Sequence, residues 1–299
     1  MVSRPVSLTA ACVTLICVLV TAHYISGDET YRPDTLRIGV LPDDSEEALH
    51  QRHSALANYL SEELAIPVEL VIPDSYNQLV SQFGQGYYDL AYFGGLTFVQ
   101  AESRYEAEAL VMRDIDARFS STFFTRPEHS GSSLQDFKGQ SLVFGSRLST
   151  SGHLMPRHFI KQRLQNSPEN HFGELIFSGS HDNTINKVSS GFGELGVANT
   201  EIINTMLRDG RLAEGDIKII WQTPPYTDYV WATSAKLAEP IKNRLRDAFL
   251  TLDGDNQQQH LVLNKSGANA FLPANKRDFH QLGSIARELK MLGERSPNK

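Results

Sequence analysis

Three consecutive hydroxyl side chains lie between a predicted buried strand, 141–145, and a predicted helix, 152–164. The first backbone N–H groups of a helix have no partner within the helix, and its dipole adds partial positive charge there. Hydroxyl groups beside such donors predict a socket for a tetrahedral oxyanion that needs no Lys or Arg. The three residues are Ser149, Thr150 and Ser151.

Two nearby residues fit this arrangement. Gly152 lets the backbone approach a ligand closely, and Pro156 belongs to the first helical turn, where a missing N–H costs least. The simpler interpretation is a capped loop without a ligand, since Ser and Thr are common at helix starts. The rest of the chain must decide between the two.

A second loop of this kind contains His181. It follows a predicted strand at 174–177 and precedes a predicted helix at 183–190, which Asp182 is expected to cap. Both loops follow strands of the same predicted sheet, so both helix starts are expected to face one cleft. A solvated loop histidine is the alternative.

Two acidic residues are further candidates for the cleft. Glu201 begins a predicted helix at 201–209, and Asp228 ends a rigid, proline-containing segment at 223–228. If both face the cleft, they suit a cationic group of a ligand, such as an amine. Complementation of the helix dipole by Glu201 and turn formation by Asp228 are the alternatives.

Several other chemistries are excluded by context. The segment 191–196 matches the dinucleotide fingerprint Gly-x-Gly-x-x-Gly, but it follows a helix and leads into a strand, and Gly191 fits a helix C-terminus better. Ser151, His181 and Asp228 could form an acyl-transfer triad, but the chain has no Gly-x-Ser-x-Gly elbow. The ten histidines show no metal-ligand spacing, so we expect neither metal nor cofactor.

Alternating strands and helices predict two α/β lobes, each with an open, mostly parallel sheet. One lobe is expected to comprise 35–120 plus 226–299 and the other 121–225, with the ligand in the cleft between them. The first lobe is expected to contain strands at 36–41, 68–72, 89–95 and 110–113 and helices at 45–64, 77–83, 97–103, 239–252 and 278–292. The second is expected to contain strands at 120–125, 141–145, 174–177, 195–198 and 217–221.

Composition and the N-terminus indicate an exported protein. The formal net charge of −7 argues against nucleic acid as a partner, and the remaining composition is ordinary for a soluble protein. Residues 1–27 carry one charge, Arg4, before a long uncharged apolar run, which predicts an export signal or, alternatively, a membrane anchor. Both cysteines, Cys12 and Cys17, lie there, so disulfides and thiolate chemistry are excluded for the rest of the chain.

Five segments in the same order resemble the phosphonate/phosphite-binding proteins of ABC transporters. This resemblance implies a type II periplasmic binding protein fold and a non-enzymatic solute receptor that delivers a phosphonate, phosphite or related oxyanion to a membrane permease. A membrane-anchored sensor component is the alternative, and an enzyme on the same fold is disfavoured. The matching segments are 88–94, 149–152, 178–181, 191–201 and 247–252.

The resemblance also implies roles for individual residues. The three hydroxyl residues and His181 would hold the oxyanion, and Glu201 and Asp228 would meet an amino group where the ligand has one. Tyr76 matches an aromatic residue that closes over the ligand, and Tyr92 lies within the first matching segment and is a further ligand candidate. The family often has a tyrosine near Phe119 and a proline at Gly95, and these departures leave the ligand itself open.

Overall fold

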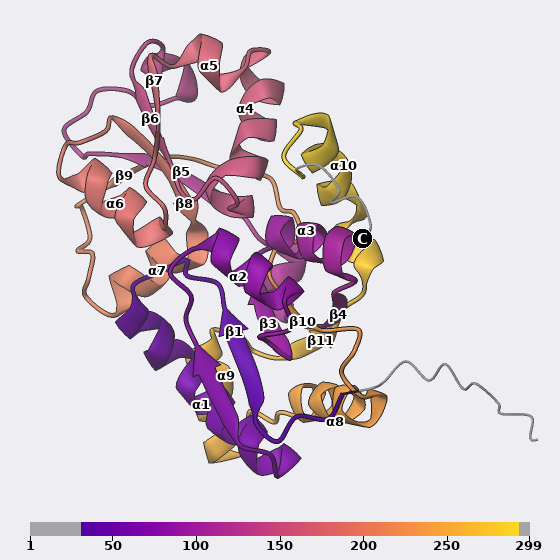
Figure 1. The fold of residues 1–299 in the computed structure, drawn as a ribbon. Helices are drawn as coiled ribbons and strands as arrows, with labels where there is room; N and C mark the ends of the chain where they lie inside the picture. Colours follow the sequence, from indigo (N-terminus) through magenta and orange to yellow (C-terminus); the bar gives the residue numbers. More distant parts are fainter. Residues whose placement is uncertain (1–30, 293–299) are drawn as a thin grey trace, which may run out of the picture.

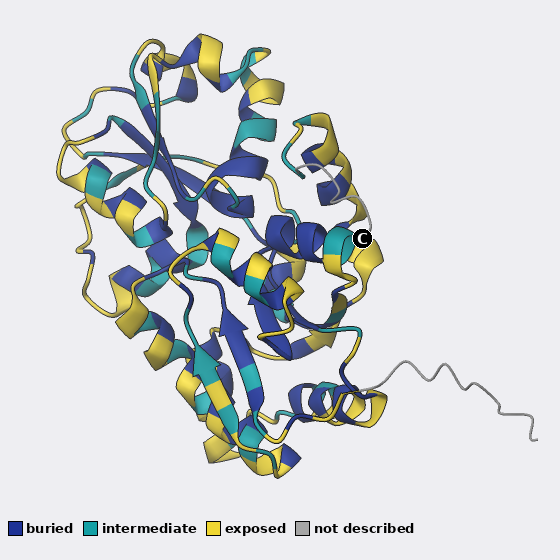
Figure 2. Cartoon of the chain, viewed as in Figure 1, coloured by how far each residue is buried: buried dark blue, intermediate teal, exposed yellow. Residues whose placement is uncertain are grey.

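The computed structural model describes residues 31–292 and contains two separate sheets. The predicted export signal or anchor, 1–27, lies outside the described residues. In 31–292, no helix is both long and apolar enough to cross a membrane. Figure 1 shows the two sheets as the centres of two lobes placed end to end, and Figure 2 shows buried strands beneath helices whose outer faces are exposed. The mixed α/β fold is confirmed.

The first lobe is built on the six-stranded sheet β11-β4-β10-β3-β1-β2. Strand β10 is antiparallel to both of its neighbours, whereas β1 is parallel to β2 and β3. The strands are β1 (Leu36–Val40), β2 (Val68–Val71), β3 (Leu90–Phe93), β4 (Glu108–Arg113), β10 (Val230–Thr233) and β11 (Phe271–Pro273). The helices are α1 (Glu46–Leu64), α2 (Tyr76–Gly84), α3 (Gly95–Tyr105), α8 (Glu239–Leu250), α9 (Gln257–Ser266) and α10 (His280–Glu288).

The second lobe is built on the five-stranded sheet β7-β6-β8-β5-β9, in which β5 is antiparallel to both neighbours. The strands are β5 (Ser121–Thr125), β6 (Ser141–Phe144), β7 (Glu174–Phe177), β8 (Leu195–Asn199) and β9 (Lys218–Gln222). The helices are α4 (Met155–Leu164), α5 (Pro168–His171), α6 (His181–Ser189) and α7 (Thr200–Arg208).

Two crossings connect the lobes, one before β5 and one before β10. They lie side by side, because Phe119 and Tyr226 form a pair of backbone hydrogen bonds of 2.7 and 2.9 Å. In each lobe the strand that enters from the other lobe, β5 or β10, runs antiparallel to both of its neighbours.

Helix α1 shows how the local sequence sets these elements. Ser45 caps the helix by accepting a hydrogen bond from the Ala48 N–H, and Ala65 ends it in the left-handed conformation with φ of 49°. The predicted apolar face packs on the sheet and is buried. It comprises Leu49, Leu56, Tyr59 and Leu60.

Most predicted elements are confirmed, with shifted ends. The predicted cap of α6 is wrong, because that helix begins at His181 and its N-cap is Ser180 rather than Asp182. Gly191 has φ of 82° just after α6, as expected of a helix C-terminus. Strand β10, helix α9 and strand β11 were not predicted.

Candidate functional site

The hydroxyl loop between β6 and α4 forms a capped helix start. Ser149 is the N-cap, and its hydroxyl accepts a hydrogen bond of 2.8 Å from the Gly152 N–H. A π-helical turn, Thr150–Leu154, follows and runs directly into α4, so the helical region begins earlier than the predicted 152. Gly152 is needed for close packing, because a Cβ there would lie 2.9 Å from the His181 ring.

The start of α3 in the first lobe faces this loop. The Leu96 N–H donates to the Thr150 hydroxyl at 2.9 Å, and the Gly95 N–H donates to Asp228 Oδ1 at 2.9 Å. A helix start from each lobe therefore lies at one buried point, where both dipoles favour negative charge. Because proline has no N–H, the glycine at 95 permits a hydrogen bond to Asp228 that proline would not.

His181, the first residue of α6, is completely buried at the same point. Its Nδ1 accepts a hydrogen bond from the Asn199 N–H at 3.2 Å, so the neutral ring carries its proton on Nε2, which lies 3.5 Å from the Ser149 hydroxyl. Burial lowers the pKa of His181 to about 4, so the ring is neutral near pH 7. His181 is therefore placed as a neutral hydrogen-bond donor, not as a solvated loop residue.

Three buried polar atoms around this point have no hydrogen-bond partner within residues 31–292. They are the hydroxyl oxygens of Tyr76 and Ser151 and the Oδ2 atom of Asp228. An unpaired buried polar group costs about 1–3 kcal/mol, so such atoms call for a missing ligand or water. We call the six residues around this point the oxyanion socket: Tyr76, Ser149, Thr150, Ser151, His181 and Asp228.

The aspartate does not preclude an anion. Burial, opposed by the Gly95 N–H, raises the pKa of Asp228 to about 7. Burial also raises the pKa of the Tyr76 hydroxyl well above its usual range. Both groups in their neutral forms donate hydrogen bonds, so the socket offers donors without a Lys or Arg: in the described part of the chain, no Lys or Arg side chain is hydrogen-bonded to a socket residue.

The acyl-transfer alternative finds no support in this geometry. Within the described residues, His181 is hydrogen-bonded to neither Ser151 nor Asp228, so no base is placed to activate the serine. His181 is instead oriented by the Asn199 backbone, and Asp228 by the start of α3.

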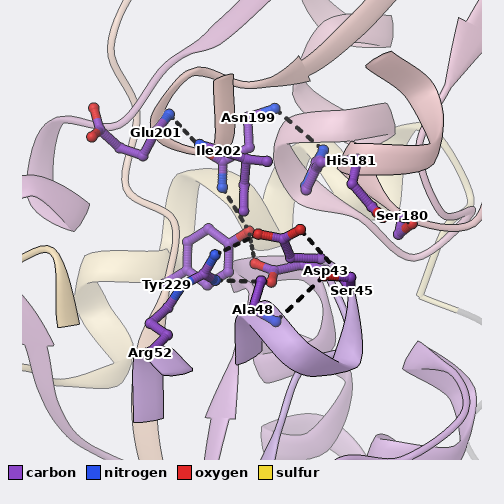
Figure 3. Close-up of polar contacts among 12 residues, drawn as sticks. Asp43, Ser45, Ala48, Arg52, Ser180, His181, Asn199, Glu201, Ile202 and Tyr229 are labelled. Carbon is purple, nitrogen blue, oxygen red and sulfur yellow. Dashed lines mark hydrogen bonds and ion pairs between the residues drawn. The ribbon is translucent and has the colours of Figure 1, made fainter. Parts of the chain in front are cut away.

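Two residues predicted to contact the ligand, Glu201 through an amino group, lie elsewhere. Tyr92 and Glu201 line a separate cavity of about 240 Å³ between the lobes, and no residue of the oxyanion socket lines that cavity. The structure therefore does not bring Glu201 and Asp228 together as an acidic pair. Figure 3 shows the Glu201 carboxylate directed away from His181 and Tyr229.

A buried chain of hydrogen bonds lines one side of this cavity. The Asn199 amide donates to the Tyr229 hydroxyl at 2.9 Å, and the Tyr229 hydroxyl donates to Asp43 Oδ2 at 2.7 Å (Figure 3). The Asp43 carbonyl in turn accepts from the His181 N–H at 3.0 Å. We call Asn199, Tyr229 and Asp43 the interlobe wall.

The sequence analysis did not identify these three residues. Asn199 is the last residue of β8, and Asp43 lies three positions after the end of β1. The carboxyl ends of strands are where ligand sites form in such sheets, and this signal could have identified both. Nothing comparable marked Tyr229, because β10 itself was not predicted.

Comparison with known proteins agrees with this geometry. Residues 38–279 match a family described as ABC transporter, phosphonate, periplasmic substrate-binding protein. The chain is 29% identical over 271 residues to a probable ABC transporter phosphite binding protein, PhnD1, of Prochlorococcus marinus (strain MIT 9301), covering 87% of this chain and 91% of that protein. It is 24% identical over 263 residues to the phosphate-import protein PhnD of Mycolicibacterium smegmatis, covering 82% and 80%.

The fold is also that of a solved relative. The structure of Prochlorococcus marinus PhnD1 in complex with methylphosphonate superposes with a TM-score of 0.82 and 29% identity, covering 87% of this chain and 100% of that one. The type II periplasmic binding protein fold is therefore confirmed. The chain belongs to the family of periplasmic substrate-binding proteins of phosphonate ABC transporters.

Proposed function

We propose that this protein captures a small tetrahedral oxyanion, phosphite or methylphosphonate, and delivers it to an ABC permease. The observation that carries the proposal is the set of three unpaired buried atoms, Tyr76 Oη, Ser151 Oγ and Asp228 Oδ2. They come from the first lobe, the second lobe and a crossing, so one ligand would satisfy all three only when the lobes are closed. The names of the Prochlorococcus relative and its complex support the choice of oxyanion.

The surroundings of the socket favour a ligand without a charged substituent. Phe119 is buried and lies edge-on to the Tyr229 ring, with 5.4 Å between centroids. The interlobe wall keeps the Tyr229 hydroxyl bonded to Asp43. An amine extending from the socket would meet the aromatic ring of Phe119 or the hydroxyl of Tyr229, which is already hydrogen-bonded to Asp43.

Hinge closure is the proposed mechanism. The two moving bodies are the first lobe, 35–120 plus 226–299, and the second lobe, 121–225. Binding energy from donors of both lobes would offset the cost of closure. We expect no turnover of the ligand, and we assign export to the periplasm to residues 1–27.

Calorimetric titration with phosphite, methylphosphonate, phosphate and sulfate tests the proposal. We expect phosphite or methylphosphonate to bind with a dissociation constant in the micromolar range or below, as about −8 kcal/mol would give. Tyr76→Phe removes one unpaired hydroxyl and should weaken binding roughly tenfold or more without lowering thermal stability. Tyr87→Phe, at an exposed tyrosine, is the control. The absence of binding to all four anions would overturn the proposal.

A further inference from the structure

The cavity lined by Tyr92 and Glu201 is separate from the oxyanion socket. It measures about 240 Å³, and we call it the outer cavity. The interlobe wall lines one side of it, and α1 and the end of α9 from the first lobe and α7 from the second lobe supply most of the rest. Any molecule held there touches both lobes. Its lining includes Tyr92, Glu201, Arg208, Lys265 and Ser266.

Two residues that line the outer cavity carry buried hydroxyl groups without a hydrogen-bond partner in the described part of the chain. They belong to Tyr92 and Ser266, whose side chains come from β3 and the last residue of α9. Tyr92 is 3% exposed and Ser266 is 4% exposed. These orphan hydroxyls form a second set, apart from those of the oxyanion socket, and each can donate to or accept from a ligand.

Most charged side chains of the outer cavity are already paired. Arg52 bonds Asp43 and Asp44, and Arg211 bonds Asp44 and Asp209. Of these pairs, Arg211–Asp44 joins the two lobes and the others lie within one lobe, and together they leave little charge for a ligand.

Glu201, Arg208 and Lys265 form no ion pair within residues 31–292. The Glu201 carboxylate accepts only a 3.4 Å hydrogen bond from Asn204, and the Arg208 guanidinium donates only to Thr205 at 2.9 Å. Glu201 and Arg208 lie seven positions apart on one face of α7, so about 10 Å of helix separates their Cα atoms. The cavity lining thus includes one half-buried carboxylate and two exposed cations that no opposite charge neutralises within residues 31–292.

We propose that the outer cavity binds a small zwitterion, a molecule of amino-acid class with one ammonium and one carboxylate group. The ammonium lies toward Glu201, the carboxylate lies toward Arg208 and Lys265, and the Tyr92 and Ser266 hydroxyls complete the hydrogen bonds. A simple anion would be repelled by Glu201, and a simple cation by Arg208. Because the site is formed by both lobes, its occupancy favours closure and raises oxyanion affinity by the same factor as the oxyanion raises zwitterion affinity.

The inference is tested with purified protein and five probes: glycine, β-alanine, 4-aminobutyrate, butyrate and butylamine. We expect at least one of the three zwitterions to bind with a dissociation constant below about 1 mM, or −4.1 kcal/mol, and at least tenfold more tightly than butyrate or butylamine. Glu201→Gln and Arg208→Gln should each weaken that binding tenfold or more, and Tyr92→Phe threefold or more. Glu214→Gln, at an exposed position, and Arg246→Gln, at a half-buried position, both outside the cavity, are the controls.

Three results would overturn the inference: no zwitterion binding up to 10 mM, equal binding of butyrate, or unchanged binding in Glu201→Gln and Arg208→Gln. Phosphite titration of the same variants keeps the two sites distinct. If phosphite binds and no zwitterion does, the outer cavity holds only water and the proposed function stands. If a zwitterion binds and no oxyanion does, the proposed function fails and the outer site remains.

Discussion

The Asp44 carboxylate in the first lobe accepts hydrogen bonds of 2.6 and 3.2 Å from the Arg211 guanidinium in the second lobe. The Asp44 side chain is fully buried and also accepts from Arg52 at 2.8 Å. This ion pair joins the lobes without touching the oxyanion socket, so it acts on closure alone.

Arg211→Gln should therefore weaken oxyanion binding about tenfold, because hydrogen bonds to charged groups contribute about 1.5–3 kcal/mol and Arg52 still neutralises Asp44. The change should shift the free protein toward the open form. Calorimetry measures the affinity, and the radius of gyration from X-ray scattering reports opening. Arg246→Gln, at a half-buried position of α8 where the guanidinium bonds Asn243, is the control. Equal affinities in the two variants would contradict the role assigned to Arg211.

Ser151→Ala should weaken oxyanion binding by about 1.5–3 kcal/mol, roughly 10- to 150-fold, because it removes a donor to a charged ligand. The melting temperature should not fall, since this hydroxyl has no partner within residues 31–292. Ser149→Ala should weaken binding and, unlike Ser151→Ala, should also lower the free energy of unfolding by about 1 kcal/mol. The reason is that the Ser149 hydroxyl caps the helix by accepting from the Gly152 N–H. Loss of stability in Ser151→Ala with unchanged affinity would show that this side of the socket is only a structural loop.

Oxyanion binding should weaken as the pH rises above 7. The pKa of Asp228 is about 7 in the free protein, and a bound anion favours its neutral form further, so binding takes up a proton above that pH. The dissociation constant should rise by up to about tenfold per pH unit. His181, with a pKa of about 4, stays neutral throughout.

Titration with sulfate, whose charge is constant between pH 6 and 9, separates this effect from ionisation of the ligand. Asp228→Asn should give an affinity that does not change over the range. A flat profile for the unaltered protein would show that Asp228 does not donate to the ligand.

The ligand's amine, where it has one, should bring little gain. The structure places Glu201 in the outer cavity, across the interlobe wall from Asp228, and a neutral Asp228 does not attract an ammonium group strongly. Competition against phosphite should give 2-aminoethylphosphonate and ethylphosphonate affinities within about threefold of each other. A preference of tenfold or more that Glu201→Gln removes would place the two acids around one amine after all.

Local features of the chain were predictable because their causes are local. The apolar spacing from Leu49 to Leu60 and the helix start after Ser149 depend on neighbours a few positions away. The π-helical turn was not predictable, because Gly152 packs against His181, which lies far along the chain. Strand β10 was not predicted, because its four residues, Val230–Thr233, are buried on both faces and show no alternation of apolar and polar side chains.

The positions of the acids could not be predicted either. The sequence places both Glu201 and Asp228 at the cleft. Whether each side chain lies in the oxyanion socket or in the outer cavity depends on the hydrogen bond between Tyr229 and Asp43, which are far apart in sequence. The chemistry of a helix start can be inferred from sequence, whereas the division of one cleft into two compartments is a long-range result.

The paired backbones of Phe119 and Tyr226 give the connection between the lobes the properties of a ribbon rather than of two separate tethers. A ribbon bends across its thin direction, but its hydrogen bonds fix the register and resist one strand sliding past the other. For the proposed hinge closure, we therefore expect the second lobe to follow a single arc and to reach the same alignment each time it closes. Groups from opposite sides, such as the Thr150 hydroxyl and the Leu96 N–H, can then meet within the few tenths of an ångström that a hydrogen bond tolerates.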